Sequence, residues 1–266
     1  MKKSKRKVWN ILIAVFGLVF LGSAVGFATT ALRGYREDQE FARLAQLVEE
    51  PESTAARPAD REEPSVEMEP QRDVLQRQCV RAAKLNPDCV GWLRIPGTKV
   101  DYPVMHTPED MQYYLRRDFY GNDSVSGTPF IGDRCDVNSR SMIIYGHNMK
   151  NGTMFGQLDR YSAESFWREH PVIELGTAGE QREYEIFGAF YTSLAAGAAQ
   201  EFPYYEYVGE LSEEVFQEFM EQLSRVRCYD TGIEPEYGDQ IVMLSTCSYH
   251  TEEGRFVVVG RRKSVE

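Results

Sequence analysis

The sequence predicts a mostly β fold: an eight-stranded barrel, closed or nearly closed, with an N-terminal helix and a long helix between strands six and seven. Two observations predict the barrel: a series of short runs rich in β-branched and aromatic residues, and the Gly, Pro, Asn and Asp residues that bound these runs. A third observation, helical spacing of apolar residues, separates the helices from the strands. The predicted strands are residues 90–95, 99–105, 128–131, 141–145, 171–175, 182–192, 240–245 and 255–261.

Three stretches interrupt or precede the strands as helices. The first begins near Arg72 and stops before Pro87, because proline disfavours a helical residue in front of it. The second covers residues 109–115. The third has apolar residues at helical spacing over residues 211–223, and Ser212 followed by two glutamates suits its N-terminus through a side-chain cap and a favourable dipole interaction.

The chain has 266 residues, of which 42% are hydrophobic, enough for one sizeable domain with appendages. Five of its 30 basic residues lie in the first eight positions, so the remainder carries 25 positive against 41 negative charges, a net charge of −16. A body this acidic repels a phosphate backbone, and no Lys/Arg-rich stripe follows the first positions. We therefore expect no nucleic-acid partner.

Residues 11–28 (ILIAVFGLVFLGSAVGFA) form an uncharged run. With its flanks this run can cross a hydrocarbon core of roughly 30 Å, and the basic residues before it favour a cytoplasmic N-terminus and an extracellular body. The alternative is a cleaved signal peptide, but the run exceeds the usual ~7–15 residue core of a signal. Either interpretation exports the body; we expect a single-pass cell-membrane protein.

The predicted organisation has three parts. Residues 1–32 are the cytoplasmic tail and transmembrane anchor, residues 33–71 are an extracellular stalk, and residues 72–266 are the folded domain. The stalk is charged and contains four prolines, with a short helix over residues 37–49 ended by Pro51.

The cysteine and histidine content argues against a zinc site. Five cysteines are an odd number, so at least one thiol is unpaired in an exported chain, and Cys79 and Cys89 are near enough in sequence to bridge. No cysteines are spaced as CxxC, and the four histidines form no HxxxH or HExxH motif. We expect no metal and no cofactor.

Cys247 is the candidate nucleophile. It ends the apolar run QIVMLST, and Arg255 opens the strand after the following loop, so both belong at one end of the barrel. A thiol nucleophile usually needs an imidazole. His147 follows another strand end, after Gly146, and we prefer it to His250, which lies in a polar loop that we expect to be mobile.

At these segments the sequence resembles the sortases, the cysteine transpeptidases of Gram-positive cell surfaces. The resemblance rests on LSTC at 244–247, with Met243 in place of the first Thr of the family motif, on YGHN at 145–148 and on GRFVVVGR at 254–261. It covers roughly residues 72–266, and WLRIPGTKVDYPV and MFGQL have the character of class B. The Asp-Pro-aromatic lid motif usual in class C is missing.

The resemblance implies a sortase-type barrel and a mechanism. Cys247 would attack a Thr carbonyl in the C-terminal sorting motif of a secreted protein, His147 would act as general acid and base, and Arg255 would hold the oxyanion or substrate backbone. The acceptor would be an amine of peptidoglycan or its lipid-linked precursor. Ser245, on the same strand face as Cys247, either lines the substrate groove or packs in the sheet. The alternatives are an exported cysteine protease and a non-catalytic tethered binding module.

Overall fold

The computed structural model describes residues 2–49, 74–195, 197 and 202–263. The chain divides into two units, Met1–Phe41 and Ala42–Glu266. The first helix, α1, runs from Lys2 to Glu49. The sequence predicted a membrane helix and then a stalk from residue 33 with a short helix over residues 37–49; in the structure one helix covers both and continues through Gly34, because a single glycine costs a helix only about 1 kcal/mol. The rest of the predicted stalk lies outside the described residues.

The predicted membrane anchor falls within α1. Within the ranges that the structure describes, no helix is both long enough and apolar enough to cross a membrane.

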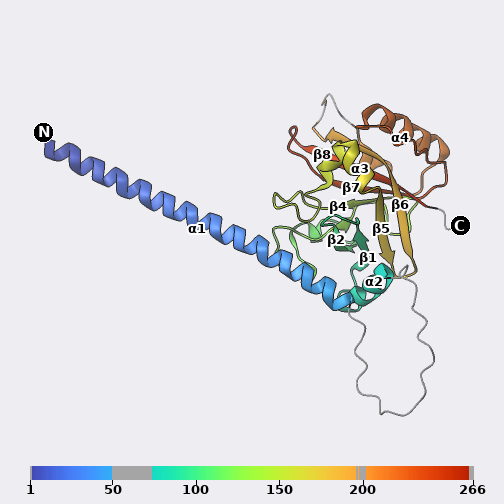
Figure 1. The fold of residues 1–266 in the computed structure, drawn as a ribbon, viewed down its shortest axis with the longest axis horizontal. Coiled ribbons are helices and arrows are strands. Elements are labelled where there is room, and N and C mark those ends of the chain that lie inside the picture. Colours follow the sequence, from blue (N-terminus) through green and yellow to red (C-terminus); the bar gives the residue numbers. More distant parts are fainter. Residues whose placement is uncertain (1, 50–73, 196, 198–201, 264–266) are drawn as a thin grey trace, which may run out of the picture. The chain divides into compact units, whose positions relative to one another are not determined.

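The eight predicted strands are all present and close into a barrel, as predicted (Figure 1). Going around it, the order is β1-β2-β3-β4-β7-β8-β6-β5, and β5 pairs with β1 to close it. β2 pairs with β3 and β4 pairs with β7 in parallel, whereas the other pairs are antiparallel. The strands are β1 Cys89–Arg94, β2 Asp101–Met105, β3 Phe130–Ile131, β4 Ser141–Tyr145, β5 Val172–Thr177, β6 Gln181–Ser193, β7 Ile241–Cys247 and β8 Gly254–Arg262.

The helices of the barrel unit are α2 (Val74–Leu85), α3 (Glu164–Glu169) and α4 (Glu213–Val226), with short 3₁₀ turns η2 (Tyr113–Arg116), η3 (Leu158–Ser162) and η4 (Tyr204–Glu206). The helix predicted over residues 109–115 is wrong: turns and η2 replace it, because the segment is too short for a stable helical nucleus. At the start of α4 the Ser212 hydroxyl accepts a hydrogen bond from the Val215 amide at 3.3 Å, as expected for a cap.

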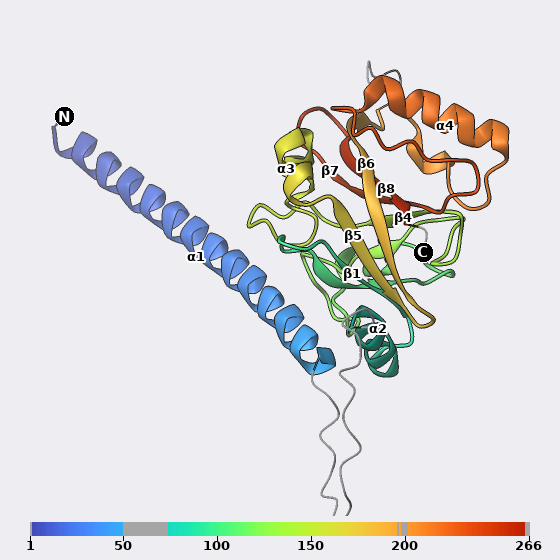
Figure 2. The same cartoon turned by 45° about the vertical axis from the view of Figure 1, so that its right-hand side comes forward.

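Helix α4 lies on the outside of the barrel beside β6 (Figure 2). Its Leu223 side chain covers Gly188, where an added Cβ would stand 3.2 Å from a Leu223 methyl group. Phe219 packs near Phe202 and Tyr207, with ring centroids 6.0 and 5.4 Å away. The helix that precedes β7 is therefore fastened to the wall of the barrel.

Candidate active site

The last residue of β7 and the second residue of β8 meet at one end of the barrel. Cys247 is directly opposite Arg255 in the antiparallel pair of β7 and β8, so their side chains share one face. Cys247 is the exposed end of a strand that is otherwise buried. This is the strand-end position that the sequence predicted for the nucleophile.

The parallel pairing of β4 with β7 brings the histidine to the same end. Tyr145, the last residue of β4, is level with Ser245, and the Gly146 amide donates to the Ser245 carbonyl at 3.1 Å. Because parallel strands end at the same edge of a sheet, His147 follows β4 where Cys247 ends β7. Residues 100 positions apart in sequence are thus neighbours in one sheet.

A pocket of about 350 Å³ opens at this end. It contains all four site residues that the sequence predicted: Cys247, His147, Arg255 and Ser245. Side chains from the segment before β3 complete its wall. The other lining residues are Met111, Gln112, Leu115, Phe130, Gly132, Asp133, Tyr145, Gly146, Leu194 and Thr246.

The His147 ring is oriented by a backbone carbonyl. Its Nε2 lies 2.7 Å from the Leu115 carbonyl oxygen, and since a carbonyl only accepts, Nε2 carries the proton. Nδ1 is then the nitrogen left to exchange a proton. Burial lowers the pKa of His147 and the Arg116 charge lowers it further, whereas the Leu115 bond opposes both. The ring is therefore mostly neutral near pH 7.

The backbone around Cys247 is tied to the histidine loop by side chains. Asn148 Nδ2 donates to the Cys247 carbonyl at 2.8 Å, and the Thr246 hydroxyl donates to the Gly146 carbonyl at 2.7 Å. A larger residue at position 146 would clash, because an added Cβ would stand 2.6 Å from the Phe155 ring. Two hydrogen bonds therefore join the loops at the two strand ends.

Arg255 is half-buried, and its Nη1 donates to the carbonyls of Glu253 and Gly254 at 3.2 and 3.0 Å. Within the described part of the chain, no carboxylate pairs with it. Its positive charge is therefore directed at the pocket rather than neutralised by an acid.

Ser245 lines the pocket but is fully buried, and its hydroxyl lies 2.7 Å from the hydroxyl of Tyr204. Ser245 therefore packs in the sheet and also borders the pocket, and its substrate-binding role stays a prediction. Tyr204, the Leu115 carbonyl and Asn148 were not predicted as site residues. Of these, only Asn148 had a local signal, its position directly after His147.

His250 does not line the pocket. Its Nδ1 lies 2.9 Å from the Ser248 hydroxyl, and its ring centroid is 4.7 Å from that of Tyr191. The loop is also held by Ser193, whose hydroxyl donates to the Glu252 carbonyl at 2.9 Å. What separates His250 from His147 is thus its position outside the pocket, and not the loose loop that the sequence suggested.

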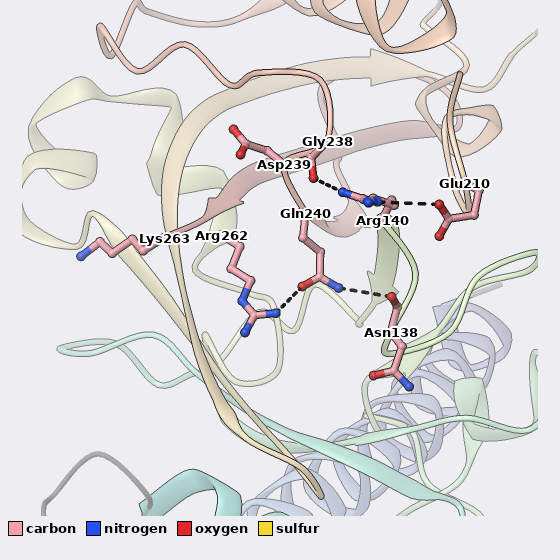
Figure 3. A pocket seen from close by; sticks show the side chains of 8 residues that line it. All are labelled: Asn138, Arg140, Glu210, Gly238, Asp239, Gln240, Arg262 and Lys263. Atoms are coloured by element: carbon pink, nitrogen blue, oxygen red, sulfur yellow. Dashed lines mark hydrogen bonds and ion pairs between the residues drawn. The ribbon is translucent and has the colours of Figure 1, made fainter. Parts of the chain in front are cut away.

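A second pocket, of about 500 Å³, lies near the opposite ends of β7 and β8 (Figure 3). Its lining residues are Asn138, Arg140, Glu210, Gly238, Asp239, Gln240, Arg262 and Lys263. Several of its polar groups bond to one another: Arg262 donates to Gln240 at 3.1 Å, and Gln240 donates to the Asn138 carbonyl at 3.4 Å. The residues that line it include no thiol, hydroxyl nucleophile or imidazole, whereas the first pocket has a thiol and an imidazole.

Comparisons with known proteins agree with this geometry. A model of the sortase domain family matches residues 93–263. Sortase B of Listeria monocytogenes is 33% identical over 184 residues, which are 67% of this chain and 71% of that protein. Sortase B of Staphylococcus aureus is 28% identical over 182 residues, again 67% and 71% of the two chains.

The fold of this chain is also similar to solved structures of sortase B. Sortase B from B. anthracis in complex with AAEK1 superimposes with a TM-score of 0.67 at 27% identity, over 88% of this chain and 99% of that chain. A Staphylococcus aureus sortase B–substrate complex gives a TM-score of 0.61 at 26% identity, over 72% and 87%. The family match and the relatives make this chain a cysteine transpeptidase, and its barrel carries a cysteine and an arginine at paired strand ends. The chain belongs to the sortase family. Within that family it is similar to class B.

Proposed function

We propose that this sortase cleaves a C-terminal sorting motif of secreted proteins at a Thr carbonyl and transfers the new carboxyl end to an amine of peptidoglycan or its lipid-linked precursor. One observation carries the proposal: a single pocket holds Cys247, His147 and Arg255. A similar sortase B has been solved as a substrate complex, which supports substrate binding by this chain.

In the first half-reaction, the Cys247 thiol gives its proton to Nδ1 of the neutral His147 ring, and the sulfur attacks the Thr carbonyl carbon. The C–N bond of the sorting motif breaks, the thioacyl-enzyme forms, and His147 gives a proton to the departing amine. In the second half-reaction, the incoming amine gives a proton to His147 and attacks the thioester. The new amide forms and Cys247 leaves as the thiolate.

Arg255 stabilises the negative charge that develops on the carbonyl oxygen, or holds the substrate backbone, through its planar fork of N–H donors. Its place opposite Cys247 in the β7–β8 pair and its lack of a carboxylate partner in the described residues support this role. Ser245 borders the groove and fits a substrate-binding role, with its hydroxyl oriented by Tyr204.

The test is mass spectrometry of the full chain after incubation with peptides that vary around a central Thr. Triglycine is the first acceptor to try, since one solved sortase B is a complex with that peptide. We expect a thioacyl adduct on Cys247 and a transferred product. Cys247→Ala should lose adduct, cleavage and transfer while retaining the fold, because an exposed strand-end thiol contributes little to the core. Turnover by Cys247→Ala would refute the nucleophile assignment.

The same experiment separates the alternatives. An exported cysteine protease forms the adduct but releases only the hydrolysed peptide, whatever the triglycine concentration. A non-catalytic binding module retains the peptide without an adduct, and Cys247→Ala leaves its binding unchanged.

Export and attachment to the cell membrane are part of the proposal. They are supported by the sequence, in which the uncharged residues 11–28 follow five basic residues, and by the extracellular substrates of the family. Cell fractionation is the test: the full chain should stay with membranes after a high-salt wash, and protease added outside the cell should reach the barrel.

A further inference from the structure

Two cysteines far from the pocket lie against each other. Cys79 belongs to the buried face of α2, and Cys89 is the first residue of β1. Their exposed fractions are 0% and 3%, α2 packs directly on β1, and the two thiols interact with each other. The Cys89 sulfur also donates to the Gly91 carbonyl at 3.4 Å. Both are free thiols in the structure. Neither α2 nor β1 contributes a residue to the candidate active site.

The backbone between the two cysteines holds them in this arrangement. The amide of Asn86 continues the pattern of α2 by donating to the Ala82 carbonyl at 2.9 Å, and the amide of Cys89 donates back to the Asn86 carbonyl at 3.0 Å. This tight turn sends β1 back along the buried face of α2. Because this turn joins α2 directly to the strand on which it packs, local chain geometry brings the two cysteines together.

We propose that Cys79 and Cys89 form a disulfide in the exported enzyme, which fastens α2 to the first strand of the barrel. The inference rests on the proposed export, because disulfides persist in oxidising compartments and are rare in the cytoplasm. One thiolate attacks a disulfide of an oxidant, a thiol–disulfide oxidoreductase or oxidised glutathione, and the second cysteine then displaces the oxidant's sulfur. Two protein thiols become one disulfide, and the oxidant is released as two thiols.

The other three cysteines are placed differently. Cys135 is buried and its sulfur donates to the Gly132 carbonyl at 3.6 Å, whereas Cys228 and Cys247 are exposed. A single bridge therefore accounts for the odd number of cysteines: one pair and three separate thiols, one of which is the nucleophile Cys247.

The bond forms during folding, since both sulfurs are buried in the finished structure. The experiment therefore unfolds the full chain carrying Cys247→Ala in guanidinium with reductant and refolds it in detergent with a glutathione redox buffer. The product is alkylated and digested with trypsin. Trypsin cleaves the chain between the two cysteines and leaves them on separate peptides, QCVR (78–81) and LNPDCVGWLR (85–94).

We expect these two peptides to be joined by a disulfide that reductant releases, with Cys135 and Cys228 alkylated. The oxidised chain should melt roughly 5 °C or more above the reduced chain. The variant Cys79→Ala should show no such difference, and Cys228→Ser should keep it. Separate alkylation of Cys79 and Cys89, or a stable glutathione adduct on either, would overturn the proposal.

Activity separates this inference from the proposed function. With Cys247 restored, the reduced and oxidised chains should have the same kcat/KM at 25 °C, because the bridge touches no residue of the pocket. A missing bridge in an active transpeptidase refutes the disulfide alone. A bridged chain without adduct formation refutes the proposed function alone.

Discussion

His147 and His250 show how residues of one type acquire different chemistry from their surroundings. Burial lowers the pKa of both rings, so the pKa does not distinguish them. Their contacts do. His147 borders the pocket with one nitrogen bonded to the Leu115 carbonyl, which leaves the other nitrogen for proton exchange, whereas His250 packs on Tyr191 outside the pocket.

His147→Ala should lower kcat/KM by about 10²–10⁴-fold, the usual loss for a general acid–base. The kcat/KM of His250→Ala should stay close to that of the unmodified enzyme. Both are measured with the same peptide and acceptor, and circular dichroism checks that each variant is folded. The reverse order of effects would mean that the loop histidine carries the proton, and the assignment of His147 would fail.

Substitutions at Arg255 separate the effect of its positive charge from the effect of its planar shape. If directed N–H groups hold the oxyanion or a peptide carbonyl, Arg255→Lys keeps the charge but loses the planar fork. It should then cost most of what Arg255→Ala costs, for which oxyanion-type losses of roughly 10²–10³ in kcat are the guide. Near-normal kcat/KM in Arg255→Lys would show instead that a positive charge beside Cys247 is sufficient.

At the scale of elements, strands and long helices were predictable because their side-chain periods are local. β4 has the predicted bounds, and α4 begins after its predicted Ser212 cap. The short helix α3 and the turn η2 were missed or misassigned, because one or two turns contain too few residues for a helical period to appear.

Helix α2 makes its closest approach to the barrel at Gly176 of β5. An added Cβ at Gly176 would stand 2.1 Å from the backbone carbonyl carbon of Leu75 and 2.6 Å from the amide of Gln76. Gly176→Ala should therefore push α2 outward and cost about 1–3 kcal/mol of unfolding free energy, seen as a lower melting temperature. Gly179→Ala is the matched control, since nothing lies within 4 Å of its added Cβ. Equal stability of the two variants would contradict the close approach of α2.

At the scale of the whole molecule, the site depends on contacts between distant parts of the chain. Asn148 and Cys247 are 99 residues apart, yet the Asn148 amide donates to the Cys247 carbonyl. The parallel pairing of β4 with β7 makes this possible, and the chain between them forms β5 and β6 on another side of the barrel and α4 outside it.

Asn148→Ala removes this link without touching the thiol or the imidazole. We expect kcat to fall about 2- to 10-fold, the loss expected for one hydrogen bond, with KM and the melting temperature little changed. Thr246→Val, which breaks the second link, should have a similar effect. If both variants turned over normally, strand pairing alone would be holding the two loops in register.

The sequence by itself determined the strand periods, the capped helix before β7, and the three strand-end residues Cys247, His147 and Arg255, because each depends on neighbours within about ten positions. Only the tertiary structure decided the carbonyl that orients His147, the burial of Ser245 against Tyr204, and the contact between the thiols of Cys79 and Cys89. These contacts between side chains depend on the strand register and on the position of each helix against the barrel. Local periodicity shows which face of an element is apolar, but it does not show which other element covers that face.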